Sequence, residues 1–101
     1  MEWNDPDLTR PVPVSATPPS YPPLAFQRRV SGTVWLRALV DENGAVADAS
    51  VDRASPTGLG FEGAAMKSVR TRVYRPATKR GVPVRVWLPI AVEFTFRATD
   101  R

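Results

Sequence analysis

The sequence predicts an α+β domain in which two helices pack on one face of a three-stranded antiparallel sheet. An alternating apolar pattern over residues 34–41 precedes a tight-turn signal, a helical apolar pattern fills residues 61–73, and a longer alternating pattern occupies residues 82–97. With 101 residues, the chain is long enough for one small core. The predicted order is helix, strand, strand, helix, strand, with an open edge at the final strand.

The first 20 residues differ in composition from the rest of the chain. Seven of the eleven prolines lie before residue 24, and the residues between them are mostly small or polar. Such a segment favours an extended polyproline conformation and does not bury a core. We therefore expect a proline-rich spacer arm over residues 1–20, a folded domain over 21–97 and a short tail over 98–101.

The first helix is expected directly after the arm. Pro22 and Pro23 suit the first turn of a helix, where amide donors are not needed. Helix-tolerant residues then continue toward Gly32. Tyr21, ahead of the prolines, is interpreted as a side chain that packs on the core, with a ligand contact as the alternative.

A β-hairpin is expected next. Apolar residues alternate along residues 34–40, which predicts a strand with one buried face, and the return strand covers residues 45–52. Asn43 and Gly44 between them tolerate the positive backbone angles of a tight turn. Because no loop has the ligand spacing of a calcium site, three acidic side chains of the hairpin are interpreted as solvated, with a metal site as the alternative: Asp41, Asp48 and Asp52.

The second helix is expected over residues 61–73, where apolar side chains recur every four residues. It is expected to end before Pro76, which disfavours helical backbone in the residue ahead of it. The final strand covers residues 82–97 and places its even-numbered, apolar residues on one face. This strand is longer than either hairpin strand, so part of it is expected to overhang.

Pro89 predicts which amides of the final strand face the open edge. A proline in a sheet is tolerated chiefly where its missing amide hydrogen would point to solvent. The odd-numbered residues, from Arg85 to Thr95, are therefore expected to direct their amides to the free edge. A bulge at Pro89, which would reverse this parity, is the alternative.

Composition excludes several classes of function. The chain contains no cysteine and no histidine, which removes thiolate nucleophiles, disulfides, Ser-His triads and most zinc or haem sites. Ser55 and Ser68 have no histidine partner, and Lys67 beside Ser68 points to a different side of the predicted helix, so we expect no enzyme, no cofactor and no metal. The net charge of +4 comes from dispersed arginines, and no nucleic-acid partner is expected.

The terminal and apolar segments give two further expectations. The longest apolar run, residues 86–92, is far shorter than the roughly 20 residues that span a bilayer. The N-terminus is acidic and differs from a signal peptide. For a domain that works outside the cytoplasm, the export segment is expected in a parent chain.

Seven short motifs follow one another in a defined order with consistent gaps. They are Tyr21-Pro22, Gly32-Thr33-Val34, Val40-Asp41 with Asn43-Gly44-Ala45-Val46, Phe61-Glu62-Gly63-Ala64-Ala65, Tyr74-Arg75-Pro76-Ala77, Gly81-Val82-Pro83-Val84 and Leu88-Pro89-Ile90 leading to Phe94. This series resembles the C-terminal domain of TonB, the energy transducer of Gram-negative cell envelopes. The resemblance covers residues 18–97, and the proline-rich arm is similar to the linker of that family.

The resemblance implies a non-enzymatic domain in the periplasm, attached to the inner membrane through an anchor that this chain lacks. The chain is accordingly expected to be an excised fragment or a variant whose anchor lies elsewhere. Such a domain binds the N-terminal TonB-box segment of an outer-membrane TonB-dependent transporter by strand addition. It transmits work, drawn from the proton gradient by an inner-membrane proton-channel motor complex, for active import such as siderophore uptake.

The partner-binding residues that the resemblance implies lie on the final strand and in the first helix. Phe26 stands where the best-known members have a glutamine, and Gln27 follows it. The full set is Phe26, Gln27, Arg85, Trp87, Ala91, Glu93, Thr95 and Arg97.

Two other functions stay open at this point. A TolA-like envelope scaffold would share the fold but bind a partner other than a transporter. A basic nucleic-acid module would show a steep salt dependence of binding. The open edge also predicts a homodimer through the final strand.

Overall fold

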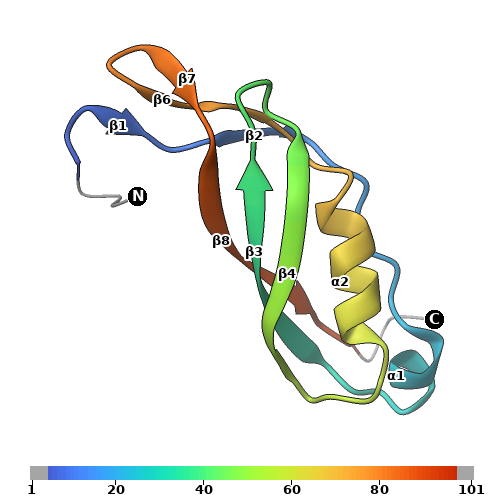
Figure 1. The fold of residues 1–101 in the computed structure, drawn as a ribbon. Helices are drawn as coiled ribbons and strands as arrows, with labels where there is room; N and C mark the ends of the chain where they lie inside the picture. The colour runs from blue at the N-terminus through green and yellow to red at the C-terminus, as the bar shows by residue number, and fades with distance from the viewer. Residues whose placement is uncertain (1–4, 98–101) are drawn as a thin grey trace.

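A computed structural model describes residues 5–97, and its centre is a three-stranded antiparallel sheet in the order β4-β3-β8 (Figure 1). The expected order of helix, two strands, helix and final strand is confirmed. Within the described part of the chain, no helix is long and apolar enough to cross a membrane. The elements of this unit are α1 (Pro23–Gln27), β3 (Gly32–Val40), β4 (Val46–Ser55), α2 (Phe61–Val69) and β8 (Val86–Phe94).

The turn between β3 and β4 forms as the sequence predicts. The Asp41 carboxylate accepts hydrogen bonds from the amides of Asn43 and Ala45, at 2.9 and 3.0 Å. Gly44 adopts a φ of 84°, which a residue without a side chain tolerates best. Asp41 therefore closes the turn with its own side chain.

Both helices cover one face of the central sheet. Val34, Leu36 and Ala38 of β3 are almost completely buried, and they share one core with Ala25 of α1 and with Phe61, Ala65 and Val69 of α2. Tyr21 packs edge-on against Phe61, with ring centroids 5.9 Å apart. The interpretation of Tyr21 as a core-packing side chain is confirmed.

The prediction of a single three-stranded sheet is wrong: over residues 5–97, eight strands form three sheets. One additional sheet has the order β1-β6-β7 and the other pairs β2 with β5. The additional strands are β1 (Leu8–Thr9), β2 (Val12–Ser15), β5 (Val73–Arg75), β6 (Ala77–Lys79) and β7 (Val82–Val84).

Two predicted boundaries are wrong because of a second core cluster. Helix α2 ends at Val69, earlier than expected, and the following chain becomes extended in β5. Tyr74 of β5 and Ala77 of β6 are buried against Val40 and Val86. The extended backbone of β5 allows this packing, so the chain leaves the helix instead of adding a last helical turn. The predicted final strand changes partner at its start: β7 pairs with β6, whereas β8 pairs with β3. The first part of the predicted final strand, expected to overhang, is thus the separate strand β7, paired with β6.

The described part of the proline-rich arm is extended, but it docks on the domain. β1 pairs with β6 and β2 pairs with β5, both antiparallel. Leu8 is only 7% exposed, and Pro11 is also buried. The expectation of a spacer that buries little is therefore wrong, because backbone pairing does not require the apolar periodicity by which cores are recognised. The boundary at residue 20 stays a prediction, and the tail over 98–101 lies outside the described residues.

Ion pairs fix the beginning of the arm. The Lys79 ammonium lies 2.8 Å from the Asp5 carboxylate, and the Arg80 guanidinium lies 3.2 Å from the Asp7 carboxylate. The hydrogen bond from Lys79, together with one from the Asp7 amide, holds the pKa of Asp5 below its usual value of 3.8. Both pairs are partly exposed to solvent.

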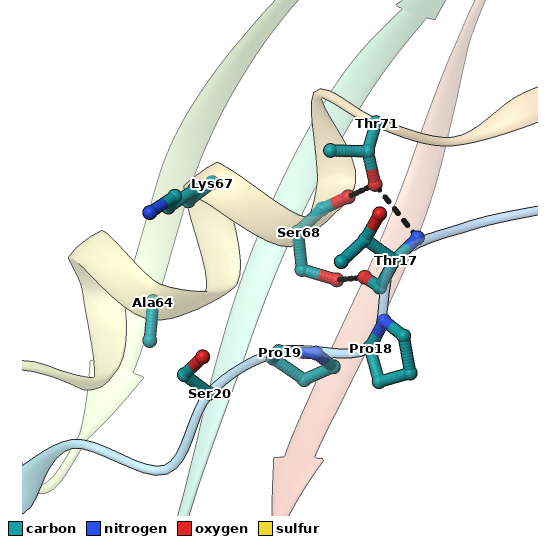
Figure 2. A pocket seen from close by; sticks show the side chains of 8 residues that line it. All are labelled: Thr17, Pro18, Pro19, Ser20, Ala64, Lys67, Ser68 and Thr71. Atoms are coloured by element: carbon teal, nitrogen blue, oxygen red, sulfur yellow. Dashed lines mark hydrogen bonds between the residues drawn. The ribbon is translucent and has the colours of Figure 1, made fainter.

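A hydrogen-bonded clamp fixes the end of the arm on helix α2 (Figure 2). The Thr17 amide donates to the Thr71 hydroxyl at 2.9 Å, and the Thr17 carbonyl accepts from the Ser68 hydroxyl at 2.7 Å. The Thr71 hydroxyl in turn donates to the Ser68 carbonyl at 2.7 Å. A cavity of about 210 Å³ lies between this part of the arm and α2.

Candidate peptide-binding edge

Strand β8 is an edge of the central sheet. Its whole length pairs with β3, from Gly32 opposite Phe94 to Val40 opposite Val86, and no other described strand pairs with it. The main-chain donors and acceptors of its second edge are therefore available to an extended segment. The structure thus provides the open edge that the sequence predicts for the final strand.

The opposite edge of the sheet, β4, is less suited to pairing. Its register with β3 shifts twice, which leaves Ala47 and Asp52 as extra residues on β4. Bulges and charged side chains are common means of protecting an edge from further pairing. The register of β8 with β3 has no such shift, so β8 is the better template for an added strand.

The register decides between the two hypotheses for Pro89. Pro89 lies opposite Arg37, and the pairing continues without interruption on both sides. A bulge at Pro89 is excluded. Because Pro89 cannot donate a hydrogen bond to β3, the odd-numbered residues of β8 are expected to direct their amides to the free edge.

The side chains of β8 divide cleanly between the two faces of the sheet. Ile90, Val92 and Phe94 are buried in the core that the helices cover, and Val86 is buried in the second cluster, against Tyr74 and Ala77. The odd-numbered side chains lie on the other face, and Trp87 is 44% exposed there. The predicted binding residues Trp87, Ala91 and Glu93 are therefore all exposed beside the free edge.

The other predicted residues of the final strand lie beyond the ends of β8. Arg85 lies between β7 and β8, and its side chain pairs with Glu42 at 3.3 Å. Thr95 and Arg97 follow the last residue of β8 and are exposed. Between them, the Phe96 amide donates to the Ser31 hydroxyl at 2.9 Å, which holds this segment beside the start of β3.

Helix α1 meets the end of the same strand. Phe26 is half-buried, with its ring centroid 5.2 Å from that of Phe96 and 5.8 Å from that of Tyr21. Gln27, the last residue of α1, is exposed. The structure thus brings the predicted helix contact and the C-terminal end of β8 together, although Phe26 is largely engaged in packing.

Several side-chain contacts on the outer face of the sheet, across β4, β3 and β8, were missed by the sequence interpretation. The Arg53 guanidinium lies 4.0 Å from the ring centroid of Trp35, and that of Arg37 lies 5.8 Å from the ring centroid of Trp87. Arg37 also pairs with Asp52 at 2.9 Å. The alternating pattern places Trp35 and Arg37 on this face, but their partners depend on the strand register and on the bulges of β4.

A shallow hollow lies on the same face of the sheet. Its volume is about 320 Å³, and its lining residues come from β3, β4 and β8: Trp35, Leu36, Asp52, Pro89, Ile90 and Ala91.

The acidic residues of the hairpin have structural roles. Asp41 caps the turn, Asp48 accepts a hydrogen bond from the Ala49 amide at 2.8 Å, and Asp52 pairs with Arg37. Over residues 5–97, no three acidic side chains come together in a way that could hold a metal ion. The Ser68 hydroxyl donates its hydrogen bond to the Thr17 carbonyl and so has a structural role in the clamp on the arm.

The fold and the edge together define a small α+β domain with one regular, unprotected strand edge, an arrangement suited to strand addition. The family model described as Gram-negative bacterial TonB protein C-terminal matches residues 17–96, and the chain belongs to this family. A solution NMR structure of the Pseudomonas aeruginosa TonB CTD is similar in fold, with a TM-score of 0.58 and 21% sequence identity. The match covers 98% of this chain and 94% of that one. No curated protein matches the chain.

Proposed function

We propose that this domain binds the N-terminal TonB-box segment of an outer-membrane TonB-dependent transporter as an added strand beside β8. The observation that supports the proposal is the free edge over Val86–Phe94, which has a regular register and no strand partner among residues 5–97. An extended segment gains main-chain hydrogen bonds there with little demand on its side chains. Membership of the TonB C-terminal family supports the same interaction.

In this proposal the domain is a non-enzymatic transducer in the periplasm. It acts from the inner membrane and passes on work that a proton-channel motor complex draws from the proton gradient. Strand addition suits this task because pulling along the strands loads several hydrogen bonds together. Gln27 of α1 and the segment from Thr95 to Arg97 extend the contact beyond β8.

Amide hydrogen exchange with a panel of synthetic N-terminal segments of outer-membrane transporters tests the proposal. In the free domain, the amides of Trp87, Ala91 and Glu93 should exchange fast, whereas those of Ile90 and Val92 should be protected. A bound segment should protect the odd-numbered set. Protection of that set in the monomeric domain without any segment would overturn the proposal, and binding restricted to segments of non-transporter envelope proteins would favour a scaffold of the TolA type.

A pair of variants at one position adds a structural control. Ala91→Pro removes an amide that the proposed register directs to the bound segment, so it should weaken binding with little change in the melting temperature. Ala91→Val keeps the amide and should bind normally. Equal binding by both variants would contradict the proposed edge.

A further inference from the structure

The outer-face row of β8, defined as Trp87, Pro89, Ala91 and Glu93, lies directly along the free edge. In the register with β3, Leu39 lies opposite Trp87, and Trp35 lies opposite Ala91. Neither helix covers this face, since the described helices pack on the buried, even-numbered side. The row is therefore the first set of side chains that an added strand meets on this face.

Among the described residues, most charged side chains around the row have a partner of opposite charge or an aromatic ring, but Glu93 does not. Arg37 pairs with Asp52 and lies near the Trp87 ring, Arg53 lies over Trp35, and Arg85 pairs with Glu42. Glu93 is exposed and forms no ion pair with any residue of the described range 5–97. The row thus has a large apolar surface at one end and an uncompensated negative charge at the other.

In an added strand, the residues directly opposite the row direct their side chains to the same face. Such cross-strand neighbours have Cβ atoms about 4.5–5.5 Å apart, and each matched pair contributes roughly 0.2–1 kcal/mol. An aromatic or β-branched side chain is the favourable neighbour for Trp87, and Lys or Arg is the favourable neighbour for Glu93. Trp87 and Glu93 are six positions apart in the same strand.

We infer that the outer-face row selects the segment that binds at β8, an inference that rests on the proposed function. The preferred segment is an extended peptide with an aromatic or β-branched residue opposite Trp87 and a Lys or Arg opposite Glu93, six positions away. Backbone pairing holds the segment, and these two side chains distinguish one segment from another.

Selection from a phage-displayed library of random ten-residue peptides tests the inference on the full chain. The wild type should enrich peptides with an aromatic or β-branched residue six positions from a Lys or Arg. The charge-reversal variant Glu93→Lys should instead enrich Asp or Glu at the second position. Asp48→Lys is the matched control, because Asp48 is an exposed acid on β4 at the opposite edge, and it should enrich the same peptides as the wild type.

Affinity measurements with the peptides that the wild type enriches give the size of each contribution. Trp87→Ser and Glu93→Lys should each weaken binding by up to about fivefold, as expected for one cross-strand pair. Trp87→Phe keeps an aromatic side chain at this position and should therefore retain most of the wild-type affinity. Unchanged affinity in Trp87→Ser would show that Trp87 does not contribute to the selection of the segment, which contradicts the inference.

Amide exchange separates failure of this inference from failure of the proposed function. If enriched peptides protect the odd-numbered amides of β8 but Glu93→Lys enriches the same sequences as the wild type, the selection by the row is wrong and strand addition stands. If no enriched peptide protects β8, the proposed function fails and the inference fails with it.

Discussion

Gly44 links the hairpin turn to the segment after α2. Its carbonyl accepts a hydrogen bond from the Tyr74 amide at 2.8 Å, and a Cβ atom at this position would lie 1.8 Å from the Tyr74 carbonyl oxygen. With a φ of 84°, an alanine would be strained as well. Gly44→Ala should therefore lower the free energy of unfolding by about 3 kcal/mol, measured by urea titration.

Gly63 provides the control within the same chain. It lies in α2, and a Cβ atom there would meet nothing within 4 Å. Gly63→Ala should raise the free energy of unfolding by up to about 1 kcal/mol, because alanine favours helical backbone. A similar destabilisation by both substitutions would contradict the close approach at Gly44.

The ion pair between Asp5 and Lys79 makes the docking of the arm depend on pH. Because the folded-state pKa of Asp5 is lowered, mainly by the Lys79 hydrogen bond, its contribution to stability is present above its usual pKa of 3.8. That contribution is lost as the pH falls through the lowered value. NMR titration of the Asp5 carboxyl group should show its pKa returning toward 3.8 in Lys79→Met, and an unchanged pKa would exclude the pair in solution.

At the scale of elements, the arm contributes to the stability of the domain through β1 and β2. Leu8 is the buried apolar side chain of β1, whereas Val14 of β2 is 60% exposed. Leu8→Ala should lower the free energy of unfolding by about 2 kcal/mol, and Val14→Ala should change it by less than about 0.5 kcal/mol. Equal, small effects in thermal or urea unfolding would show that the arm is not docked.

The elements that the sequence predicts have a local signal: a long apolar period, prolines that suit a helix start, or a tight turn between two strands. β3, α2 and β8 have long apolar periods, α1 is predicted from Pro22 and Pro23, and Pro89 predicts which amides of β8 face the free edge. The strands β5, β6 and β7 have three residues each, too few for a period to be recognised, and the first two pair with residues of the arm more than fifty positions away. The contacts of Trp35 and Arg37 depend on cross-strand register, which no single segment of sequence contains.

At the scale of the whole molecule, the free edge of β8 predicts self-association. A regular edge with an exposed tryptophan pairs readily with a second copy at high concentration. Sedimentation should show a concentration-dependent dimer, which Ala91→Lys should weaken by placing a charge on the edge. Ala47→Lys, an exposed position of β4, is the control that should leave the dimer intact. A monomer at all concentrations would contradict this interface.

The docked arm also has a mechanical consequence. Within residues 5–17 the attachments follow one another along the chain: the ion pairs of Asp5 and Asp7 with the pairing of β1 and β6, then the pairing of β2 with β5, then the clamp on Thr17. A tension applied at the N-terminus reaches the first attachment before the others, so they should break one after another, while the central sheet stays folded. Once released, residues 5–17 could reach about 40 Å from the clamp, comparable with the 48 Å longest dimension of the domain.

The arm would thus act as an extensible tether in series with the proposed transporter contact. Its early release would limit the tension on β8 until the arm is fully extended. Single-molecule force measurements, with handles at the N-terminus and on β8, should record small early extensions before the main unfolding event. Leu8→Ala should remove or weaken the first of these steps, whereas Val14→Ala should leave it unchanged. A single rupture with no earlier extension would mean that the arm and the sheet yield as one unit.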